Sequence, residues 1–463
     1  LNRLGIGRND RVVIVLPNGP EMALAFVSIA AAAATAPLNP AYKREEFDFY
    51  LSDLNAKALL IGDGMISPAV DAARARGIAV ITLRADVAHP AGAFSLEGAP
   101  AAGSGVAGFA EPDDIALMLH TSGTTSRPKL VPLTHANLVA SAANIRRSLA
   151  LTAADRGLNV MPLFHIHGLA AMLLATLSAG GSLCCTPGFD ALKFFGWLQE
   201  AAPSWYSAVP SMHQAIVARA ARNPGIVAEA RLRFVRSSSA ALPPRLMHEL
   251  ETVFGCPAIE AYGMTEASHL MACNPLPPAR RKPGSVGLAA GPDVAVMNEA
   301  GDLLPAGMEG EVVIRGSNVT AGYLANPEAN AKAFTNGWFR TGDVGALDAD
   351  GYLFLKARLK EIINRGGEKI SPREIDEILL EHPAIDQALA FAMPHPSLGE
   401  DVAAAVVLRP GMSLTEHDVR QHVGTHLAAF KVPRRVVFVA EIPKGPTGKF
   451  QRIGLAERLG LTG

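Results

Sequence analysis

A hydroxyl-rich turn followed by a lysine is the stretch of this sequence best suited to holding phosphate. The apolar run 115–119 predicts a buried strand, and residues 121–126 then offer five side-chain hydroxyls around one glycine. Hydroxyls and free backbone N–H groups surround phosphate oxygens, and a lysine adds a compensating charge. A Ser/Thr-rich surface loop is the alternative, but the lysine and the strand favour a loop that grips a triphosphate. The candidate ligands are Thr121, Ser122, Gly123, Thr124, Thr125 and Lys129.

Two later stretches suit a nucleotide as well. The sequence Tyr262-Gly263-Met-Thr265-Glu266 directly follows a predicted strand. In such a turn a threonine can bond a phosphate oxygen, and a glutamate can hold Mg²⁺ as a hard oxygen ligand. The sequence from Trp338 to Asp343 ends in a carboxylate suited to a ribose diol, with a capped turn as the alternative.

Cations and glycines mark the C-terminal part of the chain. Arg358 and Lys360 stand at a predicted linker, and the flexible pair Gly366-Gly367 follows. Near the end, a glycine-rich tip at 443–449 presents Lys449. None of these motifs decides the function by itself, but their joint occurrence in this order does.

Taken together, the motifs resemble those of the adenylate-forming superfamily, which includes acyl-CoA synthetases, luciferases and peptide-synthetase adenylation domains. The resemblance covers essentially the whole chain, from Asp10 to Lys449, and points in particular to oxalate–CoA ligases. Two positions depart from the wider pattern. Ser126 replaces a usual glycine, as in the oxalate branch, and Leu130 replaces the glycine after the loop lysine, so we expect a stiffer loop. The segments that carry the resemblance are 119–129, 162–168, 260–271, 274–277 and 363–372.

This resemblance implies a ligase that forms an acyl-adenylate from a carboxylic acid and ATP, and then an acyl-CoA. Glu266 would bind Mg²⁺, and Lys449 would lie between the substrate carboxylate and the α-phosphate, where negative charge is in excess. The small domain would turn about Lys360 after adenylation, so that Gly366 and Gly367 line a channel for the CoA thiol. The other implied ATP contacts are 121–125 and Lys129 for the β- and γ-phosphates, Tyr262 for adenine, Thr265 for the α-phosphate, Asp343 and Arg358 for the ribose, and Gly263 as a further contact with the nucleotide.

The predicted acyl pocket is polar. A fatty-acid or coumarate ligase needs apolar walls, whereas the matching stretches here contain histidines, serines and an arginine. A second carboxylate buried in the site would cost several kcal/mol without charge-assisted donors. We therefore expect oxalate, with activity that falls as the histidines lose their protons. The candidate residues are His165, Ser239, His269 and Arg236, the last with a structural role at a strand end as the alternative.

The elements that must position these residues are those of an α/β chain. Between residue 11 and about 263, apolar runs alternate with helix-length segments, which predicts two largely parallel sheets with helices outside. A buried helix is expected over 22–38, and a loose connection over 89–110. The predicted strands are 12–16, 58–61, 79–83, 115–120, 157–161, 182–186, 204–209, 232–236 and 258–262.

The pattern of apolar runs and turns changes twice after residue 262. Short alternating runs and turns over 282–357 predict a small antiparallel β-barrel. A mobile α+β domain then follows, with Ser371 and Pro372 opening a helix. The expected domains are an ATP- and acyl-binding domain, 1–358, that lacks a preceding N-terminal segment, and a C-terminal domain, 359–463. The remaining predicted elements are strands 385–392, 402–407 and 436–439 and a helix over 415–426.

Composition limits the partners. The 463 residues are 49% hydrophobic and 18% charged, which is typical of several globular domains. A net charge of −1 does not indicate binding to nucleic acid or to an anionic membrane. The uncharged run 22–38 is rich in alanine and is short for a helix that spans a bilayer. Four cysteines without a C-x-x-C pair suit a reduced, cytoplasmic protein. The expected partners are the acid, ATP and CoA, in a monomer or homodimer.

Three alternatives to an oxalate–CoA ligase remain. The chain could activate another short-chain, medium-chain or aromatic acid, or it could load a carrier-protein thiol, against which the lack of an adjacent carrier domain argues. It could also be a degenerate nucleotide-binding protein, but Lys449, Glu266 and Asp343 are all present.

Overall fold

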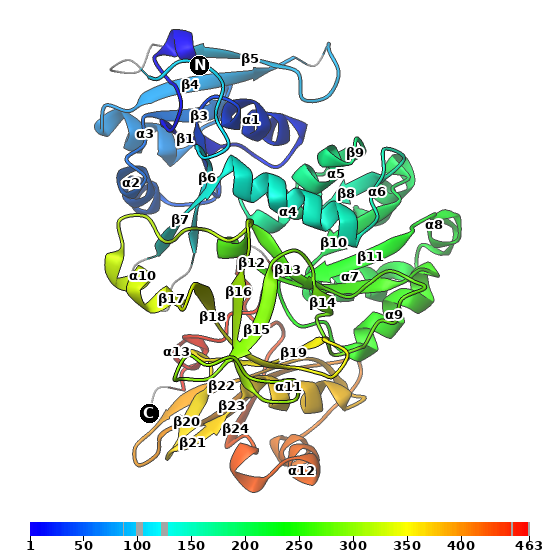
Figure 1. The fold of residues 1–463 in the computed structure, drawn as a ribbon. Coiled ribbons are helices and arrows are strands. Elements are labelled where there is room, and N and C mark those ends of the chain that lie inside the picture. The colour runs from blue at the N-terminus through cyan, green and yellow to red at the C-terminus, as the bar shows by residue number, and fades with distance from the viewer. Residues whose placement is uncertain (87, 99–104, 122–127, 446–447, 462–463) are drawn as a thin grey trace.

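Four β-sheets organise the chain, in the order of the sequence (Figure 1). The computed structural model describes residues 1–463 apart from 87, 99–104, 122–127, 446–447 and 462–463. In Figure 1 the N-terminal sheet lies at the top, the second sheet in the middle and the C-terminal sheet at the bottom. The predicted α/β architecture, with largely parallel sheets and a separate C-terminal α+β unit, is confirmed.

The first sheet has the strand order β5-β4-β3-β1-β2-β6-β7. Its pairs are parallel except for the antiparallel edges β4–β5 and β6–β7. Burial on both faces of a parallel sheet explains the continuous apolar runs, such as Arg-Val-Val-Ile-Val in β1. The strands are β1 (Arg11–Val15), β2 (Ala34–Pro37), β3 (Ala58–Gly62), β4 (Ala79–Ala85), β5 (Phe94–Gly98), β6 (Ile115–Thr121) and β7 (Lys129–Thr134).

Two predictions in this sheet were wrong. The helix expected over 22–38 is the shorter α1 (Pro20–Ala30), and β2 follows it. Pairing of β2 with both β1 and β6 outweighs the helical preference of alanine, and Pro37 cannot continue a helix. The expected loose connection contains β5, which pairs with β4 along the sheet edge.

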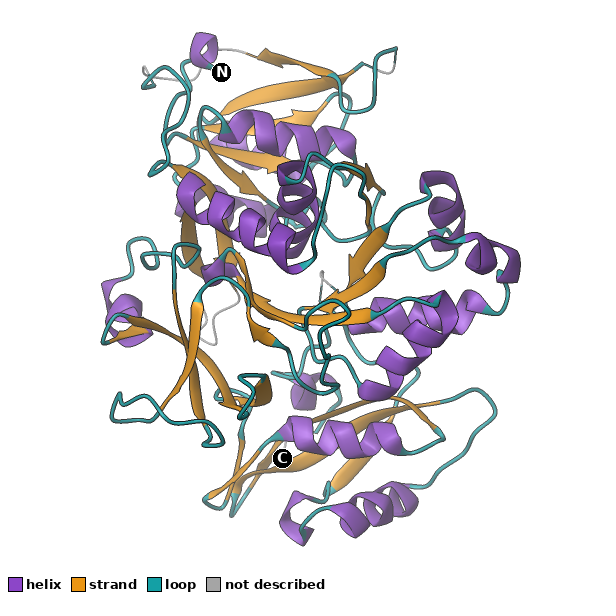
Figure 2. Ribbon diagram, turned by 45° about the vertical axis from the view of Figure 1, so that its right-hand side comes forward, coloured by secondary structure: helices purple, strands orange, loops and turns teal. Residues whose placement is uncertain are grey.

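The second sheet has the order β14-β13-β12-β11-β10-β8-β9 and is parallel from β9 to β12. Helices cover both of its faces (Figure 2). Alternate residues of β10 point to opposite cores, with Tyr206 in one and Trp205 in the other. The strands are β8 (Arg156–Asn159), β9 (Ser182–Cys185), β10 (Trp205–Ala208), β11 (Phe234–Ser238), β12 (Ala258–Met264), β13 (His269–Cys273) and β14 (Leu288–Ala289).

The third sheet is the small antiparallel unit expected over 282–357. Its pairings run from β15 through β16 to β18, and β18 also carries β17 and β19. Among the described residues no pairing joins its first strand to its last, so it is an open sheet and not a closed ring of strands. Its strands are β15 (Asp293–Met297), β16 (Gly310–Arg315), β17 (Phe334–Thr335), β18 (Trp338–Leu347) and β19 (Leu353–Arg358).

The fourth sheet lies beyond a turn at 359–361. Its central strand is β23, which pairs antiparallel with β22 and β20 and in parallel with β24. Ser371 precedes the helix α11 as predicted, but its hydroxyl donates to the Lys356 carbonyl and does not cap the helix. The strands are β20 (Ile363–Arg365), β21 (Glu368–Ile370), β22 (Ile385–His395), β23 (Gly399–Leu408) and β24 (Arg435–Phe438).

Several helices begin at residues that favour a helix N-terminus. Thr134 and Thr415 each form a capping box with the residue three positions later, and several other helices begin at proline, whose fixed φ suits a first turn. In the part of the chain described by the structure, no helix is long and apolar enough to cross a membrane. The α-helices are α1, α2 (Arg44–Asp53), α3 (Pro68–Ala75), α4 (His135–Ser148), α5 (Ala175–Ser178), α6 (Phe194–Ala201), α7 (Pro210–Ala220), α8 (Pro224–Glu229), α9 (Pro244–Phe254), α10 (Pro327–Ala333), α11 (Pro372–Glu381), α12 (Glu416–His426) and α13 (Leu455–Arg458).

Candidate active site

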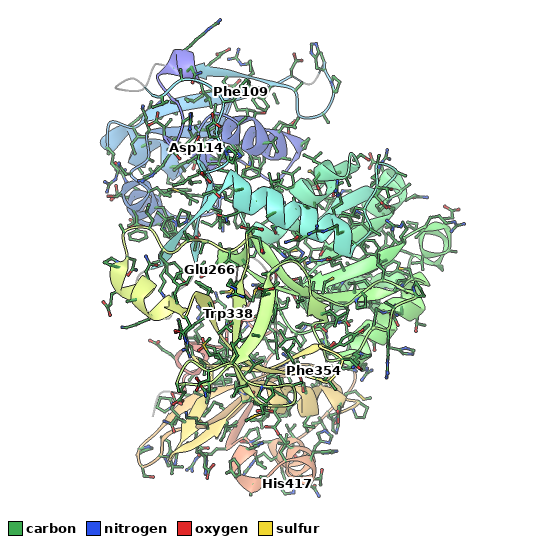
Figure 3. All side chains as sticks on the ribbon, viewed as in Figure 1. Phe109, Asp114, Glu266, Trp338, Phe354 and His417 are labelled. Carbon is green, nitrogen blue, oxygen red and sulfur yellow. The ribbon has the colours of Figure 1, made fainter. Side chains whose placement is uncertain are left out.

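The candidate residues gather where the parallel strands of the second sheet end. Chain segments leave the carboxyl ends of β8, β10, β11 and β12 at one edge, which is where ligands bind in open α/β sheets. Residues 265–266 follow β12, residue 239 follows β11, and residues 165–167 follow β8. Figure 3 shows Glu266 near the middle of the long dimension of the molecule.

Asp343 joins the candidate nucleotide residues of two sheets. Its carboxylate accepts a hydrogen bond from the Tyr262 hydroxyl and pairs with Arg358, whose Nε lies 2.7 Å from Oδ1. Asp343 and Arg358 face each other across the β18–β19 register. Burial, and then the charge of Asp343, raise the pKa of Tyr262. The three residues predicted to contact adenosine therefore form one hydrogen-bonded cluster.

Glu266 and Lys129 meet through Tyr323. The Tyr323 hydroxyl donates to Glu266 Oε1 at 2.9 Å, and Lys129 Nζ lies 4.4 Å from the centroid of the Tyr323 ring. Burial raises the pKa of Glu266, whose side chain is almost fully enclosed. Mg²⁺ is usually held by one or two protein carboxylates together with substrate phosphates, so a single buried glutamate beside a lysine fits an ATP-bound magnesium ion.

The turn predicted to bind phosphate lies between β6 and β7 in the sequence. Thr121 and Lys129 face each other at the ends of these strands, and the Thr121 hydroxyl lies 3.5 Å from the Lys129 carbonyl. The predicted contacts Ser122, Gly123, Thr124 and Thr125, like Ser126, lie outside the described residues. Leu130 is a strand residue whose side chain is buried in the core of the first sheet, so it anchors β7.

Close packing explains why residue 263 is a glycine. A Cβ at this position would lie 1.7 Å from the carbonyl oxygen of His269. Gly263 pairs with Leu270, next to His269, at the bulge between β12 and β13. Only glycine permits this approach. His269 itself has a φ of 101°, in a region that side-chain-bearing residues rarely adopt, so the bulge places a strained, buried histidine in the site.

Two of the predicted acyl residues, Arg236 and Ser239, are joined by a relay of hydrogen bonds through Ser207 and His167. Within the relay, Arg236 Nη1 lies 3.2 Å from Ser207 Oγ and 3.4 Å from His167 Nε2. Because a guanidinium only donates, His167 Nε2 accepts and its proton is on Nδ1, 3.1 Å from Ser239 Oγ. Ser207 Oγ, 2.7 Å from His167 Nε2, then donates to it. No described residue accepts the hydroxyl proton of Ser239, so this proton is available to a ligand.

Arg236 is a buried cation without a carboxylate partner among the described residues. The side chain is completely enclosed, and its Nε and Nη2 have no hydrogen-bond acceptor. Burial lowers the pKa of Arg236 to about 10, which leaves it charged at neutral pH. His269 Nδ1 is likewise buried without a partner. Unpaired donors of this kind cost free energy until an anion satisfies them.

His165, His167 and His269 are neutral in the ligand-free protein, contrary to the expectation that His165 and His269 are charged donors that lose their protons as the pH rises. Burial lowers the pKa of His165 to about 3 and holds those of His167 and His269 well below the usual value. The charges of Arg236 and Lys449 add to this effect on His167 and His269. His165 Nδ1 accepts the backbone N–H of His167, so Nε2 carries its proton. The histidines are therefore neutral donors, and Arg236 carries the charge.

Lys449 reaches this site from the C-terminal unit. The Ser211 hydroxyl of α7 donates to the carbonyl of the preceding residue, Gly448, at 2.7 Å. Burial, and then the nearby Arg358, lower the pKa of Lys449 to about 8. Because Lys449 also acts on the pKa of His165, it lies within electrostatic reach of both the ribose cluster and the acyl cluster.

Comparisons with known proteins agree with this arrangement. The family described as "AMP-binding enzyme" matches residues 1–324, and the family described as "AMP-binding enzyme C-terminal domain" matches residues 374–449. The chain belongs to the AMP-binding enzyme family. Among curated proteins, this AMP-binding enzyme is similar to the oxalate–CoA ligase of Arabidopsis thaliana, with 46% identity over 97% of this chain and 88% of that protein. It is also similar to the oxalate–CoA ligase of Saccharomyces cerevisiae, with 43% identity over 97% and 87%.

Solved structures show the same fold. The ATP-bound crystal structure of MatB from Rhodopseudomonas palustris has a TM-score of 0.86 to this AMP-binding enzyme at 29% identity, covering 98% of this chain and 90% of that one. The apo crystal structure of MatB gives a TM-score of 0.75 at the same identity and coverage. The arrangement found here is thus more like the ATP-bound than the apo structure.

Two groups of predicted residues stand apart from the hydrogen-bonded clusters of this AMP-binding enzyme, although Lys360 lies within electrostatic reach of Lys129, Arg358 and Glu266. Gly366 and Gly367 form the β20–β21 turn with φ values of 58° and 97°, and Gly366 N–H donates to Leu398 within the C-terminal unit. Lys360 is exposed in the turn between the third and fourth sheets. Partial burial, and then the charge of Lys129, lower its pKa. The CoA channel and the hinge stay predictions.

Three contributing residues were absent from the predicted site. His167 was noticed in its motif but was not assigned a role, and Ser207 and Tyr323 were not considered. Ser207 lies next to Arg236 across the β10–β11 register, which a sheet prediction with correct strand order could have shown. Tyr323 lies in an irregular segment more than 50 residues from Glu266, so no local signal identifies it.

Proposed function

We propose that this chain is an AMP-forming acid–CoA ligase and that oxalate is its acyl substrate. The reaction would join oxalate and ATP into oxalyl-AMP and diphosphate, after which the CoA thiol would displace AMP to give oxalyl-CoA. The observation that carries the proposal is Arg236, a fully buried guanidinium whose Nε and Nη2 meet no acceptor in the described part of the chain. The similarity to two oxalate–CoA ligases over nearly the whole chain supports the same substrate.

Two cations suit the two ends of a short dicarboxylate. One carboxylate would lie near Lys449 and attack the α-phosphate, and the other would accept hydrogen bonds from Arg236 and from the neutral donors His269 and Ser239. A second carboxylate is costly to bury unless charge-assisted donors meet it. A hydrocarbon tail, in contrast, would leave these buried donors unsatisfied, which disfavours a fatty acid.

For ATP, the cluster of Tyr262, Asp343 and Arg358 would exchange internal hydrogen bonds for contacts with adenosine, and Lys129 would pair with the phosphates. Mg²⁺, when bound with ATP, neutralises phosphate charge and would be held by Glu266. In this scheme the protein positions the reacting oxygens and compensates charge, while the carboxylate itself is the nucleophile.

For the second half-reaction we propose that the C-terminal unit turns about Lys360 and that Gly366 and Gly367 then approach the thiol. Lys360 stands where the third sheet ends and the fourth has not begun, which suits a hinge. Gly367 has open space around the position of a Cβ, but its φ of 97° means that any larger residue strains the turn.

The test is diphosphate release from ATP and Mg²⁺ with a panel of acids, with and without CoA. Oxalate should give the highest kcat/KM, ahead of malonate, propionate, octanoate and benzoate, and mass spectrometry should detect oxalyl-CoA only when CoA is present. Turnover of octanoate or benzoate with none of oxalate would contradict the substrate assignment. Diphosphate release without any thioester would contradict the CoA ligase.

A further inference from the structure

The first turns of α7 touch the C-terminal unit at two separate points. Ser211 Oγ donates to the Gly448 carbonyl at 2.7 Å. One turn later, Gln214 Nε2 donates to the Asp386 backbone carbonyl at 2.5 Å and lies 3.2 Å from Oδ1 of the same residue. Residues three apart share one face of a helix, so a single face of α7 bonds both the Lys449 tip and the start of β22.

The tip fits closely against this helix. Gly448 has a φ of 79°, and a Cβ there would lie 3.1 Å from side-chain atoms of both Met212 and Val209. Glycine is therefore required by backbone conformation and by space together. The residue that precedes the catalytic candidate Lys449 is packed on α7 as well as bonded to it.

The opposite face of α7 is tied to the acyl site. His213, between the two docking residues, is fully buried, and its Nε2 lies 3.1 Å from the Arg236 carbonyl while its Nδ1 lies 3.2 Å from the Tyr206 hydroxyl. The strand that carries Arg236 thus fixes the helix that receives Lys449. Through His213 and α7, the position of Arg236 is therefore linked to that of Lys449, and these are the two cations proposed to hold the ends of the acid.

The tip is also tied to the rest of its own unit. Arg452 donates to Glu361 Oε2 at 2.9 Å, beside the predicted hinge, and to Asp376 Oδ2 at 2.7 Å in α11. Because these contacts join the Lys449 segment to the hinge and to a helix of its own sheet, docking at α7 places a whole unit and not only a loose tip.

We propose that the first turns of α7 are the docking element that selects the adenylating arrangement, with Ser211 and Gln214 as positioning residues for Lys449. This inference rests on the proposed function. A contact present in one arrangement and lost in the other shifts the population between them, and so affects the half-reaction that needs it. The two hydrogen bonds should therefore matter for adenylation and not for the transfer to CoA.

The experiment compares the double variant Ser211→Ala, Gln214→Ala with the wild-type full chain in each half-reaction. Diphosphate release with oxalate should fall roughly tenfold in kcat, while the KM for ATP stays within about twofold, since two neutral hydrogen bonds contribute about this factor. Thioester formation from oxalyl-AMP and CoA should be unchanged or faster. With the native Gln214 in place, Ser211→Thr, which keeps the hydroxyl, should lose less adenylation activity than Ser211→Ala. Gln199→Ala, at an exposed position of α6, is the matched control and should change neither half-reaction.

A second readout does not depend on the reaction. Cleavage by trypsin after Lys360 in the ligand-free protein should be faster in the double variant. The turn at 359–361 is already largely exposed, but a unit released from α7 no longer holds its backbone in place, so the turn enters the protease more easily. Equal losses in both half-reactions, or wild-type behaviour in both with unchanged trypsin cleavage, would overturn the proposal. If the wild-type chain activates no acid at all, the proposed function fails, whereas the trypsin comparison still decides whether α7 docks the C-terminal unit.

Discussion

The acyl cluster and the nucleotide cluster each contain an arginine, but they differ in how the charge of that arginine is paired. In the nucleotide cluster, Asp343 is bonded to Arg358 and to Tyr262, and Glu266 is bonded to Tyr323. In the acyl cluster, Arg236 is the buried charge and no carboxylate among the described residues meets it. The nucleotide cluster must exchange partners when ATP binds, whereas the acyl cluster gains partners that it lacks.

This difference indicates where specificity resides. Exchange of one set of hydrogen bonds for another gives a modest net gain, but satisfying an unpaired buried cation removes a large penalty. We therefore expect the acyl cluster to discriminate sharply between a dicarboxylate and a neutral acid. Lys449 lies within electrostatic reach of both clusters, so its loss should affect the chemistry and not only one ligand.

The largest expected effect is that of Lys449→Ala. Diphosphate release should fall about 10²–10³-fold, because a preorganised charge at the developing bond is removed. Thioester formation from preformed oxalyl-AMP should remain largely intact, as measured by mass spectrometry of oxalyl-CoA. An equal loss in both half-reactions would contradict a role for Lys449 in the first step alone.

The next effect tests the unpaired cation directly. Arg236→Met should lower kcat/KM for oxalate about a hundredfold, since truncation of one partner of a buried charge pair costs a few kcal/mol. The free energy of unfolding, from urea titration, should not fall, because an apolar residue replaces an unpaired buried charge. The matched control is Asp343→Asn, which should raise the KM for ATP and leave the ratio of oxalate to propionate activity unchanged. If Arg236→Met also left the ratio of oxalate to propionate activity unchanged, Arg236 would have a structural role and would not bind the substrate.

The third prediction concerns pH. The pKa of Lys449 is lowered to about 8 in the ligand-free protein, so the charged form is lost as pH rises through this value. Because kcat/KM reports the free enzyme, it should fall about tenfold per pH unit above 8 in the first half-reaction. Lys449→Arg should move this decline to higher pH. The acyl histidines, whose pKa values lie far below neutral, should cause no loss of activity between pH 6 and 8.

The smallest effect is that of a neutral donor. His269→Ala should lower kcat/KM for oxalate about three- to tenfold, the contribution of one neutral hydrogen bond, with little change for propionate. Steady-state kinetics on both acids measures this ratio. A parallel drop on the two acids would assign His269 to the support of the bulge around Gly263 instead of to the substrate.

The sequence by itself determined the fold class and most nucleotide candidates, because both depend on local pattern. Alternating apolar runs and helix-length segments specify parallel strands, and the motif ending in Glu266 directly follows one of them. The sequence did not determine β2, whose alanine-rich residues become a strand only because β1 and β6 lie on either side of it. Strand order, which periodicity does not contain, also brings Ser207 beside Arg236.

Only the tertiary structure decided which residue carries the charge in the acyl site. Burial makes the histidines neutral, and the lack of an acceptor leaves Arg236 unpaired, and both depend on what surrounds a side chain and not on its neighbours in the chain. The position of Lys449 was decided in the same way. Its glycine-rich tip was evident from the sequence, but its docking on α7 requires two segments more than 200 residues apart to meet, and this contact follows from the packing of complete units.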